Sequence, residues 1–302
     1  RELFELFTLG QDVGYTQDDI VDAARALTGW NGYTSLCAPI GYANLLHDPG
    51  TKTIFGQTGN WDYDDLHDLL FTERANEIAT FICRKLYTYY VHPEPAEDII
   101  AGMAVTFLAN DWEILPVLRQ LFKSEHFFDE FVIGTQIKSP LTYMLSTVIE
   151  NELPVNAEVT NFILFSGYQL GQGLFNPVDV AGWPGDRTWV NSNTITGRWQ
   201  TADFIIFSTF ENAPQLLVDF AIRLTSPTAN DPALVTQAIV DFLLPRGLDT
   251  PEAYAVATTV FKFEVPQNYF DSGEWNLSWE TVPVQVALLL RHLSRLPEFQ
   301  LH

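Results

Sequence analysis

A histidine beside an aspartate, followed shortly by a lysine, is the strongest candidate in the sequence for a catalytic group. His47 and Asp48 precede a turn-forming Pro-Gly pair, and Lys52 comes next. An imidazole beside a carboxylate can serve as a general base or a pair of metal ligands, and a nearby ammonium can stabilise an anion. With help from Arg187, these residues form the candidate catalytic group. The alternative is a turn-capping aspartate beside an ordinary histidine.

Two tryptophans and several polar residues form a second candidate group, for ligand binding. Its members are Trp183, Asp186, Trp189, Asn191 and Arg198. Aromatic faces beside amide, carboxylate and guanidinium groups suit a carbohydrate or a peptide, because rings stack on apolar faces while polar groups bond hydroxyls. We expect the range 183–198 to be ordered and largely buried. The alternative is a rigid loop whose tryptophans fill the core and whose residues 191–194 cap the next helix.

Acidic residues gather just before one expected helix and point to calcium as a candidate cofactor. Asp62, Asp64 and Asp65 offer the clustered oxygen ligands that Ca²⁺ favours. The run lacks the glycine and the terminal glutamate of an EF-hand loop. An acidic first turn that complements a helix dipole explains it as well.

Charge and absent motifs exclude several classes of function. Lys plus Arg number 16 and Asp plus Glu number 38, and the formal charge of −22 would repel nucleic-acid phosphates and anionic lipid. The sequence contains no HExxH-like spacing, GxSxG elbow, phosphate-binding loop or dinucleotide fingerprint. Its longest apolar runs fall far short of the roughly 20 residues of a transmembrane helix. We therefore expect neither a nucleic-acid partner nor a transmembrane segment.

Helical periodicity dominates the elements that must position these groups. A capping box at Thr16 to Asp19 opens the first clear helix, and Gly29 follows its end. Apolar stripes within 78–89 and 99–108, and the repeat over 111–123, predict further helices. More are expected at about 139–152, 158–171, 199–211, 214–225, 231–243, 251–262 and 281–295. The only short strand candidates are 51–55 and 188–191. We predict an all-α fold over 1–302, a multi-helix single domain with minimal β structure.

Two long polar loops, at about 31–62 and 172–197, interrupt the helical pattern. Loops of that length inside a helical domain are usually functional, and we expect them to converge on one face. Cys37 and Cys83 are too few for a zinc site or a disulfide scaffold, and Cys83 is expected to be a buried thiol. The chain opens at Arg1 without an initiator Met, which predicts that residues upstream have been removed.

Several phrases, in a fixed order, resemble a known bacterial family. They are Arg1-Glu2-Leu3-Phe4-Glu5-Leu6, Ala23-Ala24-Arg25-Ala26-Leu27-Thr28-Gly29-Trp30, His47-Asp48-Pro49-Gly50, Ile137-Lys138-Ser139-Pro140, Gly182-Trp183-Pro184-Gly185 and Trp189-Val190-Asn191-Ser192. Their order and spacing resemble the family catalogued as domain of unknown function 1800, over at least 1–205. The resemblance implies a largely helical and typically exported protein. Because family members are longer, it also implies that the chain is the C-terminal portion of a longer protein.

The resemblance brings no established activity, so function rests on the residues. We expect an exported binding or assembly component, acting at the cell surface or outside the cell. Expected partners are another exported protein or the missing N-terminal part of the same protein, since genes of this family often neighbour those of a second exported family. The alternative is a hydrolase that acts on an extracellular polymer through His47, Asp48 and the Trp183–Arg198 loop.

Overall fold

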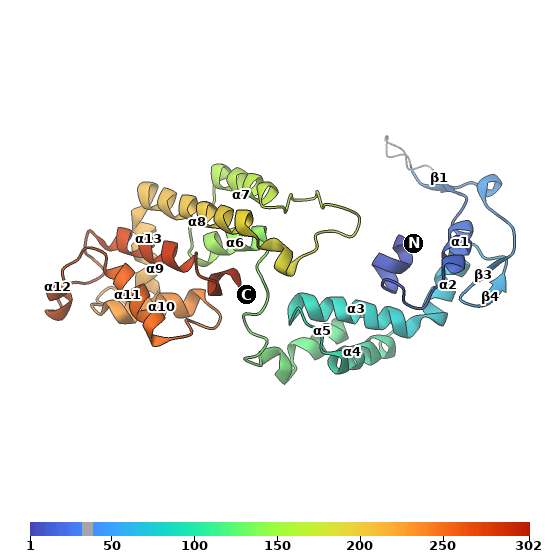
Figure 1. The fold of residues 1–302 in the computed structure, drawn as a ribbon, viewed down its shortest axis with the longest axis horizontal. Helices are drawn as coiled ribbons and strands as arrows, with labels where there is room; N and C mark the ends of the chain where they lie inside the picture. The colour runs from blue at the N-terminus through green and yellow to red at the C-terminus, as the bar shows by residue number, and fades with distance from the viewer. Residues whose placement is uncertain (32–38) are drawn as a thin grey trace. The chain divides into compact units, whose positions relative to one another are not determined.

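The computed structural model describes residues 1–31 and 39–302, and helices make up 60% of it. The only sheets in the described part of the chain are two small antiparallel pairs, which confirms the predicted all-α class. The chain divides into two compact units, Arg1–Phe127 and Phe128–His302, and each is described by itself (Figure 1). The predicted single domain stays a prediction.

The first unit combines short helices with two β-hairpins. Its elements are a π-helical turn η1 (Leu3–Thr8), α1 (Gln17–Ala26), β1 (Trp30–Asn31), β2 (Gly41–Tyr42), a 3-10 turn η2 (Asn44–Leu46), β3 (Lys52–Ile54), β4 (Gln57–Gly59), α2 (Tyr63–Glu73), α3 (Ala75–Tyr90), α4 (Glu97–Ala109) and α5 (Ile114–Phe122). Strand β1 pairs with β2 and β3 pairs with β4. The predicted loop at 31–62 therefore carries both hairpins, and the strand candidate at 51–55 is confirmed as β3.

A capping box explains where α1 begins. The Thr16 side chain accepts the Asp19 N–H while the Asp19 carboxylate accepts the Thr16 N–H, which confirms the predicted capping box. Helix α1 packs against β3, and buried apolar residues of both contribute to one core. That core contains Phe4, Leu9, Ala23, Ala26, Ile54, Phe55, Leu66, Leu70 and Ile78. The 47–52 turn is thus anchored beside a packed helix–hairpin pair.

The second unit is almost entirely helical. Its elements are α6 (Pro140–Glu150), α7 (Ala157–Gln169), a 3-10 turn η4 (Asp186–Trp189), α8 (Ser192–Asn212), α9 (Pro214–Leu224), α10 (Pro232–Leu243), α11 (Pro251–Lys262), α12 (Gln267–Asp271), α13 (Val282–Leu293) and a 3-10 turn η5 (Glu298–Gln300). Helices α6, α9, α10 and α11 begin with proline, whose missing N–H costs nothing at a first turn. Helix α13 packs against α8, α9 and α11. A large shared core encloses the fully buried Trp275.

The second predicted loop ends earlier than expected. Helix α8 begins at Ser192, whereas the periodicity placed its start near 199. Polar residues fill its first turn, so the apolar repeat that marks a helix starts late. The strand candidate at 188–191 is also wrong, because positive φ angles at Gly185 and Asp186 turn the chain into η4.

Of the two cysteines, only Cys83 lies among the described residues. Cys83 lies on α3, fully buried and unpaired, and burial raises the pKa of its thiol to about 11. The prediction of a buried thiol is confirmed. Cys37 lies outside the described residues.

Candidate functional site

An arginine from α1 fastens the His47–Asp48 turn. The Arg25 Nε lies 2.8 Å from the Asp48 Oδ2, and its Nη2 lies 3.3 Å from the Oδ1. The Gly50 N–H also donates to the Asp48 Oδ1, at 2.8 Å. The bond from Arg25, and next that from Gly50, lowers the pKa of Asp48 to about 2. A carboxylate this acidic, with both oxygens occupied, is poorly suited to act as a base.

Arg25 belongs to a polar face of α1 that binds the edge of β3. Asp19, Asp22 and Arg25 recur every third residue, so they share one side of the helix. Asp22 accepts the Thr53 N–H at 2.6 Å and pairs with the Arg25 Nη1 at 2.8 Å. Asp19 accepts the Phe55 N–H, also at 2.6 Å. The i, i+3, i+6 spacing of charges was the sequence signal that would have revealed this face.

His47 does not bond to its neighbouring carboxylate. Its Nδ1 lies 3.1 Å from the Thr28 carbonyl oxygen. A carbonyl only accepts, so Nδ1 carries a proton in this bond, and in the neutral ring Nε2 is then the acceptor. The Thr28 hydroxyl in turn accepts the Asp48 N–H at 2.8 Å. The residues are therefore joined through Thr28 and do not form a histidine–aspartate dyad.

Lys52 points inward, away from any anion in solvent. Its side chain is 1% exposed. The ammonium donates to the Asp48 carbonyl at 2.7 Å and to the Gly50 carbonyl at 3.0 Å. Lys52 therefore stabilises the turn through these two hydrogen bonds, a structural role that the sequence pattern did not indicate.

The fastened turn lies beside a cluster of exposed aromatic rings, which we call the aromatic surface: Trp30, Tyr42 and Tyr63. The Trp30 ring centroid lies 5.5 Å from that of Tyr42 and 5.4 Å from that of Tyr63. Each side chain remains about half exposed, at 47%, 47% and 48%. The His47 ring contacts Tyr42, with centroids 5.9 Å apart. Sequence reasoning missed this cluster, because its members come from β1, β2 and α2.

The acidic run before α2 behaves as a helix cap. The Asp62 side chain accepts the N–H groups of Asp64 and Asp65, and the Asp65 side chain accepts the Asp62 N–H. This capping box matches the first-turn alternative to a calcium site. Among the described residues, no group of three or more His, Cys, Asp or Glu side chains is placed to hold a metal ion.

The loop before α8 is less buried than predicted. Trp189 is buried, but Trp183 is half-buried and Asp186 and Arg187 are exposed. The expectation of a largely buried loop is wrong, because the charged side chains of Asp186 and Arg187 lie at the surface, where solvent stabilises them. Within the described chain, the buried Trp183 Nε1 has no hydrogen-bond partner.

Asn191 and Arg198, the remaining members of the second group, have structural partners. The Asn191 side chain accepts the N–H groups of Asn193 and Thr194, as in the capping alternative. Arg198 is fully buried and donates to the Lys138 carbonyl at 2.7 Å and the Gln300 Oε1 at 3.3 Å. Burial lowers the pKa of Arg198 to about 10. It joins α8 to the chain before α6 and to the C-terminal turn, out of reach of a ligand in solvent.

The two predicted groups lie in different units. His47, Asp48 and Lys52 belong to the first, whereas Arg187 and the range 183–198 belong to the second. The structure brings the first three together around one turn. The expected convergence of 47–52 with 183–198 stays a prediction.

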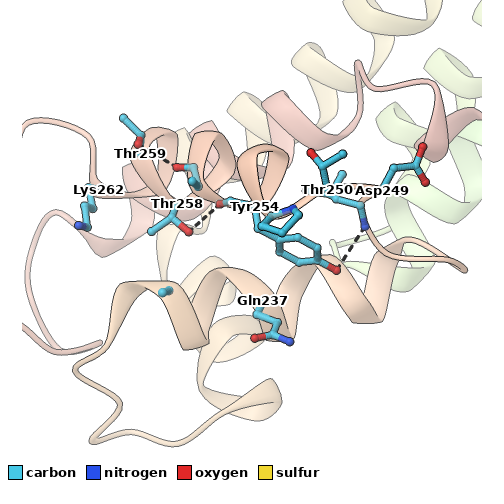
Figure 2. A pocket seen from close by; sticks show the side chains of 11 residues that line it. Gln237, Asp249, Thr250, Tyr254, Thr258, Thr259 and Lys262 are labelled. Carbon is cyan, nitrogen blue, oxygen red and sulfur yellow. Dashed lines mark hydrogen bonds between the residues drawn. The ribbon is translucent and has the colours of Figure 1, made fainter.

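A groove of about 680 Å³ lies between α10 and α11, and none of its lining residues is a predicted site residue. Figure 2 shows its lining, which includes Gln237, Thr250, Tyr254, Thr258 and Lys262. The Tyr254 hydroxyl donates to Asp241 at 2.7 Å and accepts the Leu248 N–H at 3.3 Å, and burial raises its pKa. Lys262 donates to Gln267. Internal hydrogen bonds therefore engage the Tyr254 hydroxyl and the Lys262 ammonium, which argues against a catalytic role for either group.

The molecule is therefore an all-α protein. Its candidate catalytic residues His47, Asp48 and Lys52 are held by hydrogen bonds around one turn and do not form an exposed catalytic dyad. Residues 1–301 match the family model described as "Protein of unknown function (DUF1800)", and the chain belongs to that family. The match covers essentially the whole chain, which corrects the narrower description of a C-terminal part. No curated protein and no solved structure matches it. None of the described helices is both long and apolar enough to cross a membrane.

Proposed function

We propose that the chain is an exported binding or assembly component, which acts at the cell surface or outside the cell. The observation that carries the proposal is the engagement of the candidate catalytic residues in internal bonds. Asp48 is paired with Arg25, the His47 Nδ1 with Thr28, and Lys52 with two carbonyls. The His47 ring also contacts Tyr42 of the half-exposed aromatic surface. The family resemblance supports the exported location.

A specific observation keeps the hydrolase as the second candidate. The bond to the Thr28 carbonyl selects the neutral tautomer whose acceptor nitrogen is the His47 Nε2. A general base needs such a nitrogen within hydrogen-bond reach of a proton on its substrate. In this alternative, His47 acts alone on an extracellular polymer, without the carboxylate help that the sequence suggested.

Cell fractionation combined with sedimentation tests the proposed location and the proposed assembly. The tagged full chain is followed in the cells that produce it, first by compartment and then by the size of its native particle. We expect the protein outside the cytoplasm, in a particle larger than a single chain. A cytoplasmic single chain would contradict the proposal.

A polymer assay completes the test. The purified protein is incubated with cell-wall and secreted polymers, and soluble fragments are measured over time. No release of fragments is the expected result. Steady release of fragments that disappears in His47→Gln, but persists in Tyr89→Ala, would favour the hydrolase instead.

A further inference from the structure

We propose that the aromatic surface, together with Leu45 and Leu46 of the η2 turn that follows Tyr42 in sequence, docks a basic segment of a partner protein. Arginine or lysine side chains of that segment would stack on the exposed rings, while Asp64 and Asp68 pair with their charges. The inference rests on the proposed function, for which it names the surface and the chemistry of the partner.

The first argument is the apolar area that the surface leaves in solvent. Leu45 is 98% exposed, Leu46 is more than half exposed, and both lie in η2 between Tyr42 and His47 in sequence. Adjacent exposed apolar side chains rimmed by polar residues are typical of protein interfaces. Trp and Tyr are also the side chains that most often dominate binding energy.

The second argument is charge. Residues 39–73 contain six acidic side chains and one basic side chain, Lys52, which is buried against carbonyls. On α2, Asp64 and Asp68 are both exposed and one helical turn apart, where like charges repel. Cationic groups from a partner would relieve that repulsion and stack on aromatic faces.

The same charge argument selects among occupants. A second copy of the chain carries the same formal charge of −22 and would be repelled, as would nucleic acid. A glycan could stack on the rings, but the protruding Leu45 offers nothing to sugar hydroxyls. A basic protein segment satisfies the rings, the leucines and the carboxylates together.

The third argument is rigidity, since a preformed surface loses less entropy on binding. Gly29 has φ +97°, and a Cβ there would lie 2.7 Å from the Tyr42 ring, so that ring closes over the glycine. The His47 ring also contacts the Tyr42 ring, with centroids 5.9 Å apart. The capping box at Asp62 fixes the first turn of α2 and with it Tyr63.

Fluorescence anisotropy with two matched labelled peptides provides the direct test. One peptide alternates arginine with leucine, and the other carries glutamate in place of arginine. We expect the full chain to bind the arginine peptide only. Raising salt from about 50 mM to about 500 mM should weaken that binding, because the surface charges are screened. Binding of both peptides alike, or of neither, would overturn the proposal.

Variants locate the site. Trp30→Ala, Leu45→Asp and the double change Asp64→Asn with Asp68→Asn should each weaken binding by about tenfold or more. Leu45→Asp alters a side chain that is almost wholly in solvent, so it tests the surface without risk to the fold. The controls are Tyr89→Ala, an exposed aromatic on α3, and Glu113→Gln, an exposed acid before α5, which should stay within about twofold. Equal losses in variants and controls would place binding elsewhere.

The native particle distinguishes failure of this inference from failure of the proposed function. If the assembly forms with wild-type protein but survives Trp30→Ala and Leu45→Asp, the surface is wrong and the proposed function stands. If no assembly forms, both fall. A neutral oligosaccharide that binds wild-type protein, loses affinity in Trp30→Ala and ignores the aspartate changes would also refute a basic protein partner.

Discussion

At the scale of single residues, the ion pair between Arg25 and Asp48 makes stability depend on acid. The pKa of Asp48 is about 2 when folded, held there first by Arg25, against about 3.9 for a free side chain. A lowered carboxyl pKa adds stability above the unfolded value, and that stability is lost as pH falls through the folded value. We expect wild-type protein to lose more stability than Asp48→Asn between about pH 4 and about pH 2.

Denaturant midpoints measured across that pH range check this expectation. Glu113→Gln is the matched control, because Glu113 is exposed and its side chain does not cap α5. Its curve should run parallel to that of the wild type. If the Asp48→Asn curve is parallel as well, the ion pair seen between Asp48 and Arg25 adds nothing in solution.

Two tryptophans of one loop offer a second comparison of single residues. Trp189 is buried and Trp183 is only half-buried. Trp189→Ala should therefore cost about 3–5 kcal/mol through the cavity that it leaves, and Trp183→Ala clearly less. Free energies of unfolding from urea titrations decide it. An equal or larger loss in Trp183→Ala would restore the buried loop that the sequence predicted.

At the scale of elements, the cap of α2 accounts for the acidic run without a metal. Asp62 accepts two backbone N–H groups at the helix start. Asp62→Ala should cost about 1 kcal/mol in stability, and Asp64→Ala, which removes no cap, much less. Thermal midpoints are measured in chelator and again in excess Ca²⁺. A midpoint that rises with Ca²⁺ in wild type, but not in Asp62→Ala, would point back to calcium.

Elements set by local chemistry were predictable, and contacts between distant elements were not. The capping box at Thr16 and the strand at 51–55 are written in neighbouring residues, so their patterns gave the right structure. Arg25 and Asp48 lie 23 residues apart, and no periodicity relates them. The structural role of the 47–52 turn therefore depends on the packing of α1 against β3, which the sequence does not show. The prediction of a buried loop before α8 was wrong for a related reason. Polar residues in a sequence can be solvated at the surface or bonded inside the protein, and their number alone does not distinguish the two.

At the scale of the whole molecule, each compact unit has buried apolar side chains of its own. In the first, Phe4 packs with Phe55, their ring centroids 5.2 Å apart. In the second, Phe261 packs with Trp275, at 5.7 Å and with the rings perpendicular. Separate cores can unfold separately, so the number of cooperative transitions decides between the predicted single domain and two.

We expect differential scanning calorimetry of the full chain to resolve two transitions, one from each core. Phe4 and Phe261 are both fully buried, so Phe4→Ala and Phe261→Ala should each cost about 3–5 kcal/mol through comparable cavities. Each substitution should lower one transition and leave the other in place, and the two variants form a matched pair. If a single transition falls by the same amount in both, the chain unfolds as the one domain that its sequence predicted. The formal charge of −22 would then destabilise a single cooperative unit through self-repulsion. Added salt screens that repulsion and should raise the midpoint temperature of the single transition.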